Sequence, residues 1–178
     1  MSLELIKDKI KNNQSLTIGE LKTLRDYLKI DCDITTFNNI DYTNNKPKII
    51  LIQKDYNKEL MPFGHFVCCY YNNKDNTLYY FDCSDASKPL ELHKKYNLSN
   101  EAQPVQDFYN YIKKYNLDYF NIKLQGKKSE NCGINSLLRI MNKDLTNEEY
   151  KHYLQELKKR FNFKNYDDLI NNIMLLYL

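Results

Sequence analysis

Residues 65–83 read HFVCCYYNNKDNTLYYFDC, and this stretch decides the centre of the fold. Two aromatic and apolar runs, 65–71 and 77–83, flank the turn-forming residues 72–75. Such a pattern predicts two antiparallel strands joined by a tight turn. If the turn is centred between Asn73 and Lys74, His65 lies directly opposite Asp82 on the same face of the hairpin.

An imidazole beside a carboxylate is the orienting half of a catalytic triad. The carboxylate fixes the tautomer of the ring and stabilises its protonated form. A histidine at a strand end also forms such a pair for purely structural reasons. The hairpin alone therefore leaves a catalytic and a structural interpretation of His65 and Asp82 open.

A second motif, QGKKSENCG at residues 125–133, precedes an apolar stripe of Ile134, Leu137, Leu138 and Met141. The stripe predicts a helix that begins at about Cys132, where the positive end of the helix dipole favours the nucleophilic thiolate. Gln125, at the end of a predicted strand, and the Cys132 N–H would then donate hydrogen bonds to a developing oxyanion. Gly133 would leave room for a substrate backbone. A structural role as a small buried hydrophobic residue is the alternative for Cys132.

The remaining patterns predict an α+β protein that forms one domain over residues 1–178. Capping boxes at Thr17–Glu20 and Thr146–Glu149 mark the starts of two helices. Hydrophobic periodicity predicts helices at 3–12, 18–29, 104–115, from 132, after 146 and at 166–176, strands at 49–52 and 119–124, and a polar loop at 31–47.

The order His65, Asp82, Gln125, Cys132 resembles the cysteine proteases of the adenovirus maturation-protease and SUMO/ubiquitin-like-specific protease superfamily. The resemblance covers about residues 48–142 and depends on the spacing of short motifs. It implies a papain-like fold of the adenovirus-protease type. In that fold a central, mostly antiparallel sheet is packed by helices, and the nucleophile begins a core helix. It also implies that Cys132 is the nucleophile, His65 the general base, Asp82 its orienting acid and Gln125 the oxyanion donor.

Three positions depart from the family pattern. Phe66 follows the histidine where the family usually has Trp, and we expect Phe66 to form a wall of the substrate site. Asn131 precedes the nucleophile where Asp is frequent. Asp85 is an alternative to Asp82 as the third member of the triad, although it lies beyond the predicted strand register.

Composition excludes several classes of protein. The four glycines are not spaced as in phosphate-binding loops, and no apolar run reaches the length of a membrane span. Five cysteines and no signal peptide indicate a reducing compartment. The adjacent Cys68 and Cys69 would point to opposite faces of a strand, so we expect no metal site and no required cofactor.

A net charge of +3 with only three scattered arginines gives weak support for nucleic-acid binding. The abundance of lysine and asparagine is typical of an AT-biased coding sequence. Together with the resemblance, it suggests a virophage, a Polinton-like element or a related DNA virus as the source.

The expected function is a cysteine endopeptidase that cleaves capsid or other virion precursors next to glycine during virion maturation. Its expected location is the host cytoplasm or viral factory and then the virion. The family precedent also raises activation by a peptide or by DNA. Three alternatives remain: a deconjugating protease for a ubiquitin-like modifier, an acyltransferase with the same triad, and a non-enzymatic nucleic-acid or virion-binding module.

Overall fold

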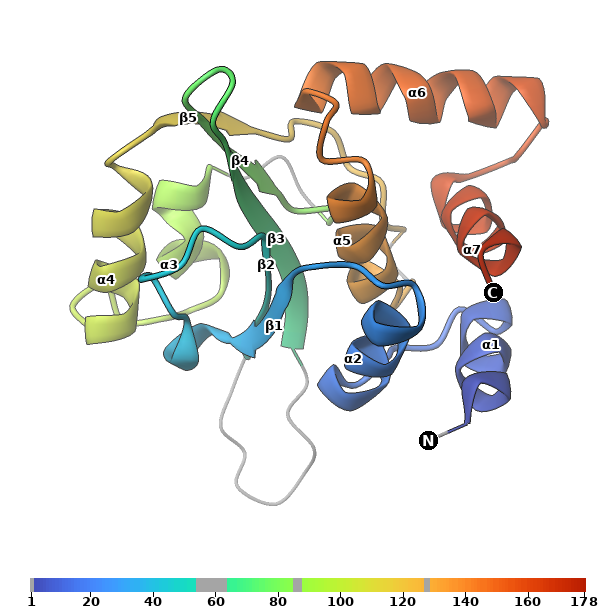
Figure 1. Cartoon of the computed structure of the whole chain (residues 1–178), viewed down its shortest axis with the longest axis horizontal. Helices are drawn as coiled ribbons and strands as arrows, with labels where there is room; N and C mark the ends of the chain where they lie inside the picture. The colour runs from blue at the N-terminus through green and yellow to red at the C-terminus, as the bar shows by residue number, and fades with distance from the viewer. Residues whose placement is uncertain (1, 54–63, 85–87, 127–128) are drawn as a thin grey trace.

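A five-stranded sheet in the order β1-β2-β3-β4-β5 forms the centre of the computed structural model, which describes residues 2–53, 64–84, 88–126 and 129–178 (Figure 1). Its strands are β1 (Asp33–Thr36), β2 (Lys48–Gln53), β3 (Gly64–Asn72), β4 (Thr77–Phe81) and β5 (Asn116–Tyr119). The central pairs β2–β3 and β3–β4 are antiparallel, and the second of them is the hairpin that the sequence predicts. The outer pairs β1–β2 and β4–β5 are parallel, so the sheet is mixed.

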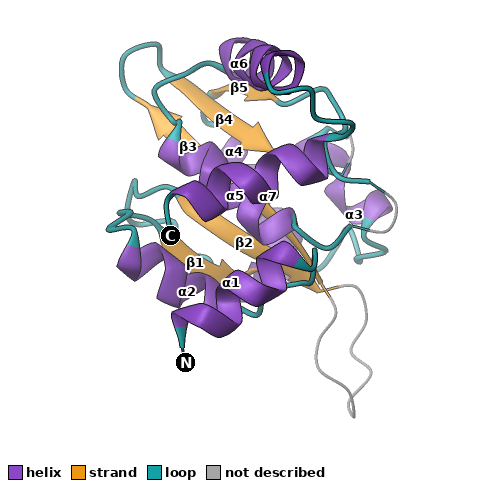
Figure 2. Cartoon of the chain, turned by 90° about the vertical axis from the view of Figure 1, so that its right-hand side faces the viewer, coloured by secondary structure: helices purple, strands orange, loops and turns teal. Residues whose placement is uncertain are grey.

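Helices cover both faces of this sheet (Figures 1 and 2). One face carries α1 (Leu3–Lys11), α2 (Ile18–Tyr27), α5 (Cys132–Met141), α6 (Asn147–Arg160) and α7 (Tyr166–Leu176). The other face carries α4 (Gln103–Ile112) and a short segment formed by a 3-10 turn (Pro89–Glu91) and α3 (Leu92–Lys95). This arrangement confirms the α+β class. Among the described residues, no helix has the length and apolar character needed to span a membrane.

Alternation along β3 explains why the sheet is covered on both sides. Phe66, Cys68 and Tyr70 pack into the core on the α5 face, whereas Val67 and Cys69 pack into the core on the α4 face. Successive side chains of a strand point to opposite faces, and all five are buried here. The two adjacent cysteines therefore diverge as expected.

The predicted pairing within the β3–β4 hairpin is wrong by two residues. Asn72 pairs with Thr77, and Cys68 with Phe81, because the turn is a four-residue loop in which Asn76 adopts a left-handed conformation with φ of 55°. A shift of two residues leaves every side chain on its predicted face. His65 and Asp82 are thus diagonal neighbours beyond the end of the ladder instead of a directly opposed pair.

Three further segments differ from the sequence prediction. The expected loop at 31–47 contains the edge strand β1 and a 3-10 turn at Phe37–Asn39. Only Ile34 of β1 is buried, which is too little periodicity to reveal a strand. The strand expected at 119–124 lies earlier, at β5. The segment 89–95, which includes α3, was not expected to form helical turns.

Arg139 of α5 is a fully buried charge that ties three elements together. Its guanidinium donates to the carbonyl oxygens of Asn142 and Leu145, both at 2.8 Å, and to Oδ1 of Asn147. It also lies 5.0 Å from the ring centroid of Tyr70 and 4.8 Å from that of Tyr150. Hydrogen bonds and aromatic faces therefore replace the water that this cation loses on folding.

We expect Arg139→Leu to lower the free energy of unfolding by about 3 kcal/mol, because it removes the hydrogen bonds of the buried guanidinium and its donation to the buried Asn147 Oδ1. Urea denaturation measures the change. Arg160→Leu, at an exposed position on α6, is the matched control and should change the free energy by less than about 0.5 kcal/mol. Equal effects of the two substitutions would contradict the role of the buried guanidinium.

Candidate active site

His65 and Asp82 lie together at the end of the sheet where β3 begins and β4 has just ended. The His65 Nε2 atom is 2.8 Å from Oδ1 of Asp82. Both side chains are buried, with Asp82 only 1% exposed. The same carboxylate oxygen accepts hydrogen bonds from the backbone N–H and the hydroxyl of Ser84. Asp82 therefore contacts His65 from the predicted face of the hairpin, although not from the predicted register. Asp85, the alternative acid, lies outside the described residues.

Cys132 begins α5 and approaches the same end of the sheet from the opposite face. The Phe66 backbone N–H donates to the Cys132 Sγ atom at 3.4 Å. The first amide groups of a helix have no acceptor within the helix. In α5 the first helical hydrogen bond is donated by the Asn135 N–H, to the Asn131 carbonyl. The sulfur therefore has both a direct N–H donor and the positive end of a helix dipole beside it.

The His65 ring connects the two halves of the site. Burial opposes its charged form, but hydrogen bonds to Asp82 and to Cys132 outweigh burial and raise the His65 pKa to about 9. Because Nε2 is taken by Asp82, Nδ1 is the ring nitrogen left for proton exchange with the thiol. Burial would raise the pKa of Asp82, yet its contacts with His65 and Lys95 hold that pKa well below the ordinary range.

Gln125 is buried in the loop that leads to Cys132. It lies well after β5, not at the end of a strand, and its backbone N–H is bonded to the Cys83 carbonyl at 2.8 Å. Its Nε2 atom donates to the Ser129 carbonyl at 2.6 Å, and its Oε1 atom accepts a weak bond from the Cys83 thiol. One of the two Nε2 hydrogens is therefore committed to the loop itself, and no acceptor among the described residues takes the other.

Phe66 and Gly133 both pack in the core next to Cys132. Phe66 is 4% exposed. A Cβ atom on Gly133 would lie 3.3 Å from the Phe66 ring and 3.4 Å from Leu21. Glycine at 133 therefore allows α5 to approach β3 and α2 closely, and the expected contacts of both residues with a substrate stay predictions.

A buried network of amides holds Asn131, the residue before Cys132. Asn131 Oδ1 accepts from the Ser129 hydroxyl and from Asn135 Nδ2, both at 2.9 Å. Asn131 Nδ2 donates to Asn171 of α7, which in turn donates to Asn13 beyond α1. The neutral side chain at 131 thus joins the start of α5 to both terminal helices. Sequence patterns gave no signal of these long-range contacts.

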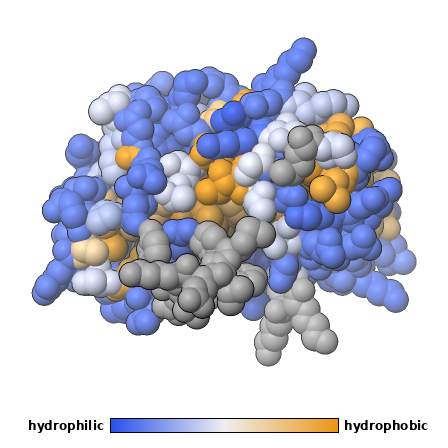
Figure 3. Space-filling model, turned by 90° about the horizontal axis from the view of Figure 1, so that it is seen from below, coloured by the Kyte–Doolittle hydropathy of each residue, from blue (hydrophilic) through white to orange (hydrophobic). Residues whose placement is uncertain are grey.

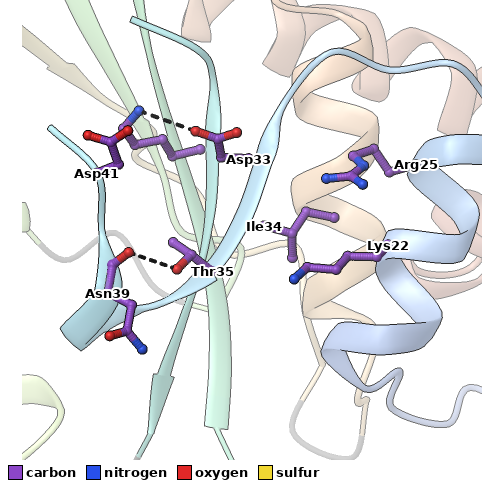
Figure 4. A pocket seen from close by; sticks show the side chains of 8 residues that line it. Lys22, Arg25, Asp33, Ile34, Thr35, Asn39 and Asp41 are labelled. Atoms are coloured by element: carbon purple, nitrogen blue, oxygen red, sulfur yellow. Dashed lines mark hydrogen bonds and ion pairs between the residues drawn. The ribbon is translucent and has the colours of Figure 1, made fainter. Parts of the chain in front are cut away.

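Two other features lie apart from this site. In the described part of the chain, no cluster of His, Cys, Asp or Glu is arranged to hold a metal ion. A groove of about 300 Å³ lies between α2 and the β1 edge (Figure 4), lined by Lys22, Arg25, Asp33, Ile34, Thr35, Asn39, Asp41 and Lys48. Lys48 pairs with Cys69, four residues along β3 from His65, roughly 13 Å away. The groove therefore belongs to the other end of the strands.

Seen from below, the molecule presents the end of the sheet where β2 ends and β3 begins (Figure 3). Apolar residues gather at the centre of this face and are surrounded by hydrophilic ones.

No protein-family model matches the sequence, and no curated protein matches it. The structure is similar to three solved structures of the SUMO protease Ulp1. Two have the catalytic cysteine oxidised, to a sulfinic or a sulfenic acid, and one is the C-terminal protease domain in complex with Smt3, the yeast ortholog of SUMO. Each shows 13% identity and a TM-score of 0.41 over 76% of this chain and 68% of the other. This is a distant similarity, so the function proposed below is inferred from this chain's own residues.

We expect iodoacetamide to alkylate Cys132 rapidly at pH 7, because the His65 ring, whose pKa is about 9, is protonated at that pH and places a positive charge beside the sulfur. His65→Ala should slow the reaction at pH 7 by about tenfold or more and restore it as the pH rises past about 8.5, where ordinary thiols ionise. Mass spectrometry of the Cys132 peptide measures the rate. His152→Ala, on the exposed side of α6, is the control. Equal rates at pH 7 in wild type and His65→Ala would rule out the ion pair.

Asn171→Ala should slow the alkylation of Cys132 several-fold and lower the free energy of unfolding by about 1–2 kcal/mol, because it leaves the Asn131 amide without its α7 partner. Asn172→Ala is the matched control, since Asn172 is exposed and bonds only to the Asp168 carbonyl in its own helix. The two variants are compared by alkylation kinetics and urea denaturation. Indistinguishable alkylation rates would show that α7 does not position the nucleophile.

Proposed function

We propose that the protein is a cysteine endopeptidase in which Cys132 is the nucleophile, His65 the general base and Asp82 the residue that orients it. The observation that carries the proposal is the buried chain of contacts from Asp82 through the His65 ring to a thiol at a helix N-terminus. Each group has the environment that its role requires: the acid is ionised, the imidazolium is stabilised, and the sulfur accepts an N–H bond.

The reaction follows from this arrangement. His65 Nδ1 takes the thiol proton, and the Cys132 sulfur attacks the peptide carbonyl carbon. The carbonyl oxygen becomes an oxyanion that the Cys132 N–H and the remaining Gln125 hydrogen would stabilise. As the C–N bond breaks, His65 returns its proton to the leaving amine, and a thioester remains. Water, deprotonated by His65, then cleaves the thioester and releases the acid and the free thiol.

Access to the sulfur supports a preference for glycine at the scissile bond. Cys132 is 6% exposed and His65 8% exposed, so a substrate residue without a side chain reaches the sulfur most easily. Capsid or other virion precursors cleaved next to glycine during maturation are the substrates that we propose. The lysine- and asparagine-rich composition of the chain supports a source among small DNA viruses, and a location in the host cytoplasm or viral factory and in the virion.

A mass-spectrometric screen of a denatured peptide library and of purified capsid precursor tests the proposal. Wild type should produce new termini flanked by glycine, and Cys132→Ala should produce none above background. Cys32→Ala, which removes a buried thiol before β1, is the control that should retain cleavage. Absence of any cleavage by folded wild type would refute the proposal.

The same site would act on an isopeptide or peptide bond at the end of a ubiquitin-like modifier. A panel of modifier C-terminal fluorogenic substrates distinguishes the two substrate classes. Rapid turnover of one modifier with no cleavage of capsid precursor would replace the proposed substrate and leave the proposed chemistry intact.

A further inference from the structure

Two neighbouring residues, Lys95 and Tyr96, contact the carboxylate of Asp82 from the α4 face of the sheet. Lys95 Nζ lies 2.6 Å from Oδ2, and the Tyr96 hydroxyl donates to the same oxygen at 2.8 Å. His65 occupies the other oxygen, Oδ1. One buried carboxylate is therefore shared between an imidazole and an ammonium group.

The contacts of Asp82 leave its carboxylate no freedom to rotate. Ser84 adds two donors to Oδ1, and Lys95 Nζ also lies 3.0 Å from the Ser84 hydroxyl. A carboxylate accepts about four hydrogen bonds, and these contacts use all of that capacity. The Lys95 side chain is 18% exposed, so its charge is only partly screened by solvent.

Tyr96 also contacts the base directly. Its ring stacks on the His65 ring with centroids 5.8 Å apart and an angle of 18° between the planes. Lys95 Nζ lies 5.1 Å from the centroid of the same tyrosine ring. Burial, with the adjacent negative charge of Asp82, raises the pKa of Tyr96 far above its ordinary value, so the phenol stays a neutral donor.

We propose that Lys95 and Tyr96 are positioning residues of the site: together they fix the Asp82 carboxylate and the plane of the His65 ring, and Lys95 takes a share of the carboxylate charge that would otherwise act on His65 alone. The proposal deepens the proposed endopeptidase function and rests on it for its catalytic meaning. The charge sharing itself is a property of the folded chain.

The sign of the effect follows from the charges that the described residues place around His65. Asp82 and the thiolate form of Cys132 favour the imidazolium, whereas Lys95 is a cation on the same carboxylate and opposes it. The Tyr96 phenol is neutral, and burial raises the pKa of the Cys83 thiol so that it is neutral too. Lys95 therefore lowers the pKa of His65 from the value that Asp82 and Cys132 alone would give.

The decisive experiment is an NMR titration of the three histidines in the full-length protein, in which the His65 signal is identified by its absence from His65→Ala. In Lys95→Met the His65 pKa should rise by about one unit above that of wild type. Lys95→Arg keeps the charge and should leave it unchanged. Lys94→Met is the matched control, because Lys94 is exposed on the same short helix and pairs only weakly with Glu91.

The pH profile of kcat/KM gives the catalytic readout. The alkaline limb, near pH 9 in wild type, should move upward in Lys95→Met and stay in place in Lys94→Met. Tyr96→Phe keeps the stacked ring, and it should lower kcat several-fold with little change in KM because the carboxylate loses one donor.

The outcomes separate this inference from the proposed function. A His65 titration that is unchanged or shifted downward in folded Lys95→Met overturns the inference. If Lys95→Met does not fold, the same criterion applies to Lys95→Gln. If the His65 titration shifts as expected in Lys95→Met but the wild-type protein cleaves no substrate, the charge sharing is supported and the endopeptidase is refuted.

Discussion

Burying the Asp82 carboxylate requires that both of its oxygens be paired, because an unpaired charge in the interior costs several kcal/mol. His65 and Ser84 satisfy one oxygen, and Lys95 and Tyr96 satisfy the other. These partners come from β3, from the turn after β4 and from the end of α3. The acid thus fixes the relative positions of three elements, and it holds the ring that faces the thiol.

The two halves of the site come from opposite faces of the sheet and meet at its end. The His65 ring stacks on Tyr96 on the α4 face, whereas Cys132 enters with α5 from the face that carries the terminal helices. The contact between the Phe66 N–H and the Cys132 sulfur bridges them. A sheet covered on only one side would have no second layer to supply a partner at this end.

Sequence reasoning succeeded where a local pattern carries the information. Alternation along β3 and the apolar stripe of α5 placed His65, Asp82 and Cys132 on the correct elements. The predicted face of Asp82 is correct in spite of a register error of two residues, because every second side chain of a strand points to the same face. Sequence reasoning gave no signal of the close packing of α5 on β3 and α2 in which Phe66 and Gly133 take part. It also failed for Gln125, whose predicted strand ends earlier because β5 pairs with β4 at Asn116–Tyr119.

The sequence by itself determined the hairpin, the helix that begins at Cys132 and the residue types of a thiol, an imidazole and a carboxylate, because each follows from periodicity or spacing within a short window. Only the tertiary structure decided which groups surround them. Lys95 and Tyr96 reach Asp82, and Asn171 reaches Asn131, across separations in the chain that no local pattern spans. Those contacts are set by the packing of helices on the two faces of the sheet, and packing is a property of the whole chain.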